Sequence, residues 1–437
     1  MHALIKLREM SGTQVRGCLF AALWALMASA MLVESDVYRY ATIVLVVFAV
    51  VSRRTDVREV SRDWLAFACY AWSIYVAVRF LSGVLISAEK GTSEWLYIFP
   101  VFFPFTGVAL YTTRQYILPA TTLLLICGAV GLLLTLDSSA MLAGERAAPL
   151  FHHNPIHAGV GAGMLFLTSL FAMLHGAETG QPGGKNKWPQ LALGGATAVL
   201  SLVGMLGSQS KGAWLALAMT ITFMSILMLL HYAGRWRLLI LGSLLLVTIA
   251  IATVSPPYVE RVAGTTMGAA LRLTDDTLTA RGPLAAIQRS IADPTTPSSM
   301  RERLKLWSNA RELIEEAPWI GWGNAWLVQW QRTTYSNVGY NLMHNGYLEI
   351  MVRHGLLGIT FLLVFVIAAA HTVNDARRRG MISSSLAVYL YSVSFFFFCT
   401  ITTNSNNRLA IGESFFILTA AAVFAIRLAV KKLHDRV

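Results

Sequence analysis

Long apolar runs dominate the pattern of hydrophobic and polar positions along this chain. A membrane-spanning helix needs about 20 mostly apolar residues. Twelve candidate runs occur, at residues 17–33, 37–51, 65–85, 95–111, 116–136, 156–174, 191–206, 213–230, 238–254, 346–370, 386–402 and 409–430. The pattern therefore predicts an all-α polytopic membrane protein with about 12 transmembrane helices.

The basic residues alternate along the connections between these runs. They precede the first run, fill every second connection after it and close the chain, whereas the intervening short connections hold acids or few charges. By the positive-inside rule, this alternation places both termini in the cytoplasm, as an even number of spans requires. The basic start, the apolar stretch and Ala28-Ser29-Ala30 imitate a cleavable signal peptide, but we interpret this segment as an uncleaved first span.

Composition supports the membrane assignment and narrows the partners. Of the 437 residues, 55% are hydrophobic and only 13% are charged, which excludes an ordinary water-soluble chain. The net charge of +12 marks membrane sidedness, so we expect membrane lipids around the protein and no nucleic acid as a partner. The four cysteines have no metal-type spacing and lie in or beside apolar runs, so they indicate neither a zinc site nor a disulfide framework.

One connection, residues 255–342, is long enough to fold over the membrane. The predicted topology puts it on the non-cytoplasmic side and divides the chain into residues 1–254 with transmembrane helices 1–9, the loop 255–342, and residues 343–437 with helices 10–12 and a cytoplasmic tail. The loop has one lysine, Lys305, and eight arginines: Arg261, Arg272, Arg281, Arg289, Arg301, Arg303, Arg311 and Arg332. Eight acids in the same loop would also fit a solvated, salt-bridged surface. As a set, however, guanidinium groups suit phosphate, because each can form paired charge-assisted hydrogen bonds to anionic oxygens.

A short helix is predicted within this loop. Ser299 and Glu302 have capping-box spacing, and an amphipathic pattern follows near residues 300–317. Arg301 and Arg303 would stand in the first turn, where the helix dipole and unpaired N–H groups favour a polyanion. An amphipathic helix lying on the bilayer surface fits the same spacing equally well.

Two further features fall on the same side of the membrane. Lys211, in Ser208-Gln209-Ser210-Lys211-Gly212, stands between the seventh and eighth spans, where it could reach a lipid phosphate or extend to the interface. His344 begins the tenth span, and a helix N-terminus disfavours the imidazolium, leaving a neutral ring that can accept a proton. A lone histidine at a membrane boundary is also typical of an interfacial residue. His152, His153 and His157 have no acid in their stretch, so we do not interpret them as a metal site.

These features suit a donor that carries a glycan on polyprenyl pyrophosphate. Its phosphates would lie at the bilayer surface, and departure of pyrophosphate requires its charge to be neutralised. Sugar transferases often use a divalent ion held by an Asp-x-Asp motif, which does not occur here. Cationic side chains would replace the metal, so we expect no metal and no cofactor, with His344 as the general base.

The same residues resemble a known family. Arg303, Trp307, Pro318, Gly321 and Gly323, followed by His344-Asn345-Gly346-Tyr347-Leu348-Glu349 and Gly355, resemble the signature of the O-antigen ligase and polymerase superfamily. Asn154-Pro155 and the 208–212 turn resemble its earlier motifs, so the likeness covers about residues 150–365. The resemblance implies a GT-C-like membrane glycosyltransferase of a Gram-negative inner membrane.

Such ligases join undecaprenyl-pyrophosphate-linked O-antigen, the donor, to lipid A-core, the acceptor, on the periplasmic face without a metal ion. The resemblance implies His344 as base and Arg303 as a pyrophosphate ligand. Lys211 stands where many relatives have arginine, and Arg301 is assigned by proximity. Asn345, Tyr347 and Glu349 would support the histidine within its motif.

Several functions remain open at this point. A ligase comes first, because twelve spans and one large loop before the histidine motif resemble that branch. An O-antigen polymerase shares the donor and the side of the membrane, and a protein O-oligosaccharyltransferase belongs to the same superfamily. A transporter would use charges within spans, for which Arg79 and Glu413 are candidates.

Overall fold

The computed structural model describes residues 12–91, 94–179, 187–232, 256–279, 282–339 and 342–435. Within these ranges the chain is helical, and its extended pairing is an isolated bridge between Val33 and Phe151. Helices of the predicted spans are α2 (Gly12–Ala28), α3 (Val37–Ser52), α5 (Trp64–Ile86), α6 (Phe103–Thr113), α7 (Ile117–Thr135), α9 (Pro155–Thr179), α10 (Lys187–Gly207), α11 (Lys211–His231), α17 (Gly346–Arg378), α18 (Ser384–Thr400) and α19 (Ala410–His434). The protein is an all-α polytopic membrane protein, as predicted.

Eight segments of the described chain are long and apolar enough to cross a membrane. One of them, Glu94–Thr135, contains two of the predicted spans, and α3 and α18 are shorter apolar helices. The predicted span 238–254 lies outside the described residues. Large side chains remain exposed on the helices, including Phe67 at 71%, Leu134 at 73% and Leu85 at 78%. Such exposure is expected where lipid, and not water, surrounds the bundle.

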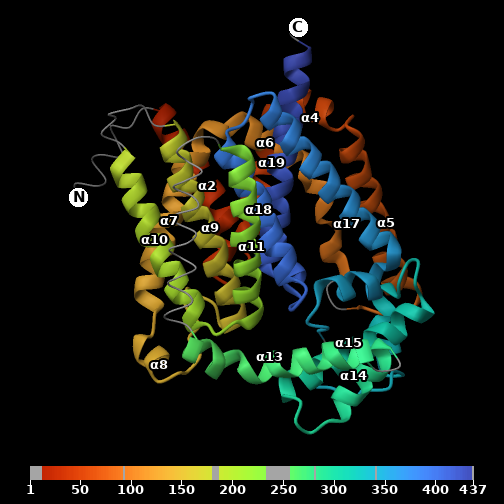
Figure 1. Ribbon diagram of the computed structural model, residues 1–437. Coiled ribbons are helices and arrows are strands. Elements are labelled where there is room, and N and C mark those ends of the chain that lie inside the picture. Colours follow the sequence, from red (N-terminus) through yellow and green to blue (C-terminus); the bar gives the residue numbers. More distant parts are fainter. Residues whose placement is uncertain are drawn as a thin grey trace, which may run out of the picture.

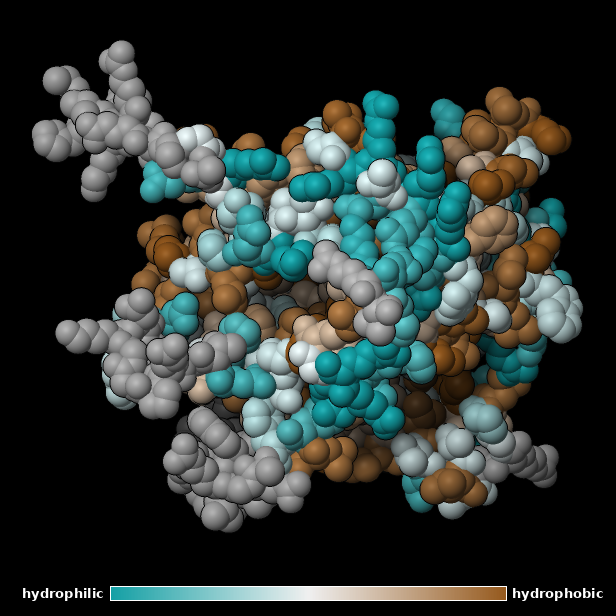
Figure 2. Space-filling model, turned by 90° about the horizontal axis from the view of Figure 1, so that it is seen from above, coloured by the Kyte–Doolittle hydropathy of each residue, from teal (hydrophilic) through white to brown (hydrophobic). Residues whose placement is uncertain are grey.

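The two ends of the bundle differ. Helices α13 (Pro256–Thr279), α14 (Pro283–Ala292) and α15 (Ser298–Glu316) lie across one end, shown in green in Figure 1. At the opposite end α4 (Arg54–Val60) lies beside the last turns of α19, where Lys431 and Glu59 are 3.9 Å apart and Lys432 pairs with Asp56. Figure 2, seen from above, shows hydrophilic side chains gathered near the middle of this end and hydrophobic ones around much of its rim.

The layer across the other end has a small core of its own. Leu306 and Leu313 of α15 pack with Trp326 and Trp330 of α16 (Trp326–Trp330), and Met343 joins the same cluster. This cluster is separate from the two larger cores between the spanning helices. Since Val352 of α17 also belongs to it, the layer is attached to a spanning helix by apolar packing.

Helix α17 is broken at Gly355, where φ is 60°. The segment after α15 enters the break: the N–H of Leu356 donates to the carbonyl of Pro318 at 2.8 Å, and the N–H of Trp322 donates to that of Val352 at 2.8 Å. A Cβ on Gly355 would lie 2.4 Å from the carbonyl carbon of Trp319. The glycine is therefore needed both for its backbone angle and for the close approach of a second chain segment.

The charges predicted within spans have structural partners. Arg79 donates hydrogen bonds to the carbonyls of Ile320 and Gly321, so it holds the same segment against α5. Glu413 accepts from Tyr38 and forms an ion pair with Arg39 at 3.0 Å. Both side chains thus connect elements of the bundle, which is a structural use of charge.

We predict that Gly355→Ala lowers the free energy of unfolding by about 3 kcal/mol, because it adds both a strained φ and a backbone clash. Gly268→Ala is the matched control: Gly268 lies within α13 and has open space around its Cβ position, so we expect no loss. Thermal unfolding in detergent, followed by circular dichroism, compares the two. Equal midpoints would show that the break in α17 does not require glycine.

Candidate active site

His344 lies immediately before α17, at the end of the bundle that carries α13 to α15. Asn345 caps the helix, its side-chain oxygen accepting from the N–H groups of Tyr347 at 3.0 Å and Leu348 at 3.2 Å. The hydroxyl of Tyr347 donates to the carbonyl of Phe398 at 3.1 Å, which ties this turn to α18. Asn345 and Tyr347 therefore position the turn that presents His344. The histidine itself has a φ of 49°, a conformation uncommon outside glycine.

The residue before the histidine is held on both sides. The N–H of Met343 donates to Oε1 of Glu349 at 2.9 Å, and its carbonyl accepts from the indole N–H of Trp307 at 3.0 Å. Trp307 belongs to α15, one turn after Arg303. We call these two hydrogen bonds the Met343 clamp. It fixes His344 relative to the helix that carries Arg303.

A buried charge network supports the clamp. Glu349 is fully buried and pairs with Arg353, while Nη1 of Arg408 lies 3.4 Å from its carboxylate. Arg353 in turn pairs with Glu94 at 3.1 Å. The Ser405 hydroxyl also donates to Glu349, at 3.0 Å. Because an uncompensated buried charge is costly, these partners hold the Glu349 carboxylate in one place, and with it the Met343 N–H.

Arg303 of α15 lies near His344, and two further cations lie near Arg303: Lys211 at the start of α11 and Arg146 in the loop before α9. We call these three cations the cationic cluster. Lys211 lies within electrostatic range of both arginines, and its Nζ donates to Thr266 of α13 at 2.7 Å. Across the described ranges none of the three forms an ion pair with a carboxylate. The cluster is thus an uncompensated positive site suited to a polyanion.

Arg146 was not among the residues that the sequence pointed to. Its position depends on Gln209, whose side-chain amide donates to the carbonyls of Gly144 at 2.9 Å and Glu145 at 3.1 Å. The N–H of Ala147 also donates to the carbonyl of Gly207, at 2.9 Å. The turn that precedes Lys211 therefore also positions Arg146. The sequence around Arg146 held no motif that would have singled it out.

Arg301 does not join the cluster. It lies near Asp293, in the turn that follows α14. Residues two apart on an α-helix project about 200° from each other, so Arg301 and Arg303 face opposite sides of α15. The predicted capping box is also wrong: α15 begins at Ser298 after Pro297, with no side-chain cap, and Glu302 pairs with Lys305 at 3.0 Å.

The local charges affect the protonation of His344. Burial and the nearby Arg303 lower its pKa, while a side-chain hydrogen bond with Asn404 raises it, and the net shift is downward. The imidazole is therefore neutral at pH 7 and able to accept a proton. Burial and Arg146 also lower the pKa of Arg303.

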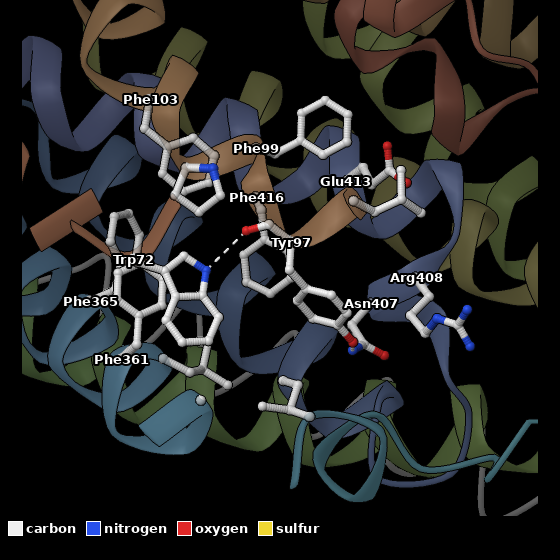
Figure 3. A pocket seen from close by; sticks show the side chains of 15 residues that line it. Trp72, Tyr97, Phe99, Phe103, Phe361, Phe365, Asn407, Arg408, Glu413 and Phe416 are labelled. Atoms are coloured by element: carbon white, nitrogen blue, oxygen red, sulfur yellow. Dashed lines mark hydrogen bonds between the residues drawn. The ribbon is translucent and has the colours of Figure 1, made fainter. Parts of the chain in front are cut away.

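A separate apolar pocket lies between α5, α17, α19 and the 3₁₀ helix η2 (Glu94–Phe102). Figure 3 shows Asn407 and Arg408 together on one side and Trp72, Phe361 and Phe365 on the other; the Trp72 indole donates to the Tyr97 carbonyl at 2.9 Å. None of the residues predicted for the site lines this pocket. Considering the described residues alone, no group of three or more His, Cys, Asp or Glu is placed to hold a metal ion.

Part of the chain matches a known protein family. Residues 196–363 match the family described as O-antigen ligase. This segment of the chain is thus similar to the O-antigen ligase family. The match supports a function of the O-antigen ligase or polymerase type in general, and a membrane enzyme that resembles a glycosyltransferase. The matched segment includes Lys211, Arg303 and His344, whereas Arg146 lies before it. No curated protein matches the chain.

We predict that His344 titrates below its usual value of about 6.5, and that Arg303→Gln raises this midpoint because it removes a neighbouring positive charge. Arg301→Gln is the control, since Arg301 faces away from the cluster. Nitrogen-15 NMR of labelled histidines, with His344→Asn to assign the signal, gives the midpoints. Equal shifts in the two variants would contradict the proposed contact between Arg303 and His344.

Proposed function

We propose that this protein is an O-antigen ligase, which transfers O-antigen glycan from undecaprenyl pyrophosphate to lipid A-core. The observation that carries the proposal is the Met343 clamp, because it couples a neutral histidine to an arginine of the cationic cluster. The clamp would thereby hold the two groups that this transfer needs, a base and a site for pyrophosphate, in one fixed relation.

The cationic cluster would bind the pyrophosphate of the donor. Arg303 and Arg146 offer planar forks for paired hydrogen bonds, whereas Lys211 offers a point charge. Each charge-assisted hydrogen bond contributes about 1.5 to 3 kcal/mol. Contacts that strengthen as pyrophosphate departs lower the barrier, because they stabilise the leaving group more than the bound donor.

His344 would act as the general base. Its neutral ring takes the proton of the acceptor hydroxyl as that oxygen attacks the anomeric carbon, and the bond from this carbon to pyrophosphate breaks. The electron pair of the broken bond leaves with the pyrophosphate, toward the cationic cluster. A neighbouring positive charge suits this step, since Arg303 both lowers the pKa of His344 and faces the leaving group.

We place the reaction at the periplasmic face of a Gram-negative inner membrane, with both termini in the cytoplasm. In support, α13 to α15 and the site lie at one end of the bundle, and the basic ends of α17 and α19 lie at the other (Figure 1). The proposed division is residues 1–254 and 343–437 in and beside the membrane, with residues 255–342 forming the periplasmic layer.

Transfer by purified protein tests the proposal. With undecaprenyl-pyrophosphate glycan, lipid A-core and a metal chelator, we expect glycan on lipid A-core, and we expect His344→Ala to abolish it. His371→Ala, an exposed histidine of α17, should transfer normally. Longer lipid-linked glycan formed without lipid A-core would instead indicate a polymerase, glycan on protein an oligosaccharyltransferase, and the absence of any transfer a different class.

We further predict that Trp307→Phe reduces transfer at least about tenfold, because His344 loses its fixed position relative to Arg303. The loss of one hydrogen bond should lower the free energy of unfolding by only about 1 kcal/mol. Trp319→Phe is the control, since that side chain is 71% exposed. Unchanged transfer by Trp307→Phe would show that the Met343 clamp does not matter for the reaction.

A further inference from the structure

A carboxylate and two histidines from distant parts of the chain meet near His344. Glu34 follows the 3₁₀ helix η1 (Ser29–Met31), and its carboxylate lies 3.5 Å from Nδ1 of His157 and 3.9 Å from Nδ1 of His153. His157 belongs to the first turn of α9. Sequence spacing could not reveal this group, because its acid stands 123 positions before His157 (157 − 34).

Backbone contacts already hold these two segments together. The N–H of Phe151 donates to the carbonyl of Leu32 at 2.9 Å, and the N–H of Glu34 donates to the carbonyl of Phe151 at 3.4 Å. The ring of His152 also meets the carbonyl of Met31, at 3.2 Å. These backbone contacts join the segments, and the Glu34 carboxylate adds only a long hydrogen bond from the N–H of His153, at 3.4 Å.

Glu34 differs from the buried carboxylates of the bundle. Glu349, Glu94 and Glu413 each pair with an arginine. Within the described chain, the ion-pair partners of Glu34 are the two histidines, of which His157 also forms a side-chain hydrogen bond with it. Its side chain is 38% exposed. The carboxylate thus keeps oxygen lone pairs available for a ligand.

A chain of packing contacts connects this group to the surroundings of His344. A Cβ on Gly159, in the same stretch of α9 as His157, would lie 2.5 Å from Oγ of Ser208, in the turn before Lys211. A Cβ on Gly212 would lie 2.2 Å from Oγ1 of Thr403, the neighbour of Asn404, which hydrogen-bonds to His344. His157 is also within electrostatic range of His344.

We infer that Glu34 and His157 form the subsite for the acceptor sugar, a conclusion that rests on the proposed function. A carboxylate would repel pyrophosphate, but it accepts strong hydrogen bonds from sugar hydroxyls, and the nearby imidazole offers a further polar contact. On this assignment, the donor and the acceptor occupy regions of opposite charge near His344. Donor phosphate occupies the cationic cluster, and the acceptor is held at Glu34, where its attacking hydroxyl reaches the base.

Steady-state transfer by the full-length protein tests this assignment. We expect Glu34→Ala to raise KM for lipid A-core about tenfold, the effect of losing one charge-assisted hydrogen bond. KM for the undecaprenyl-pyrophosphate donor should change less than twofold. Glu34→Gln should be intermediate, because its amide oxygen still accepts. Asp36→Asn, in the same loop and paired with Arg39 at 3.2 Å, is the matched control and should behave as wild type.

Direct binding of lipid A-core without donor separates this inference from the proposed function. Weaker binding to Glu34→Ala than to wild type, in a protein that makes no transfer, would support the subsite and overturn the proposed reaction. An acceptor KM within twofold of wild type in an active Glu34→Ala protein would overturn the subsite. An equal rise in donor and acceptor KM would also overturn it, because the effect would not be specific to the acceptor.

Discussion

The hydrogen bonds on either side of Met343 are the constraint on which the rest of the site depends. One comes from Trp307 in the layer across the bundle and the other from Glu349 in a spanning helix. Glu349 can serve only while its charge is balanced by Arg353 and Arg408, so a buried ionic network maintains a backbone position. Removal of one partner would leave a buried charge uncompensated, which costs several kcal/mol.

The break in α17 is a second feature that attaches the layer to the bundle. In a continuous helix the backbone groups around residue 355 would bond only to one another, so none would be left for hydrogen bonds to the layer. At Gly355 the helix opens, and the segment 318–322 bonds to the freed groups, with Arg79 holding its carbonyls from α5. The layer is thus attached both by the Met343 clamp and by the segment 318–322. Together they give Arg303 of α15 a defined place above the membrane helices.

Around His344 the proposed chemistry follows from an uneven distribution of charge. The cationic cluster has no carboxylate partner in the described ranges, and Glu34 has no arginine or lysine partner there. Protein salt bridges usually neutralise such groups. In the proposed reaction, the cationic cluster would take the anionic leaving group while Glu34 would take hydroxyl groups of the acceptor.

The sequence by itself determined that the chain is a helical membrane protein, and it pointed to Lys211, Arg303 and His344, which we propose as members of the site. Membrane spans can be read from the sequence because they depend on local hydrophobicity. Lys211, Arg303 and His344 can be read from it because each stands in a short motif of neighbouring residues. Tertiary structure alone placed Arg146 and Glu34, because each is positioned by backbone and side-chain contacts with residues far along the chain. It also placed Arg301 away from Arg303, since the rotation of a helix about its axis is decided by what it packs against.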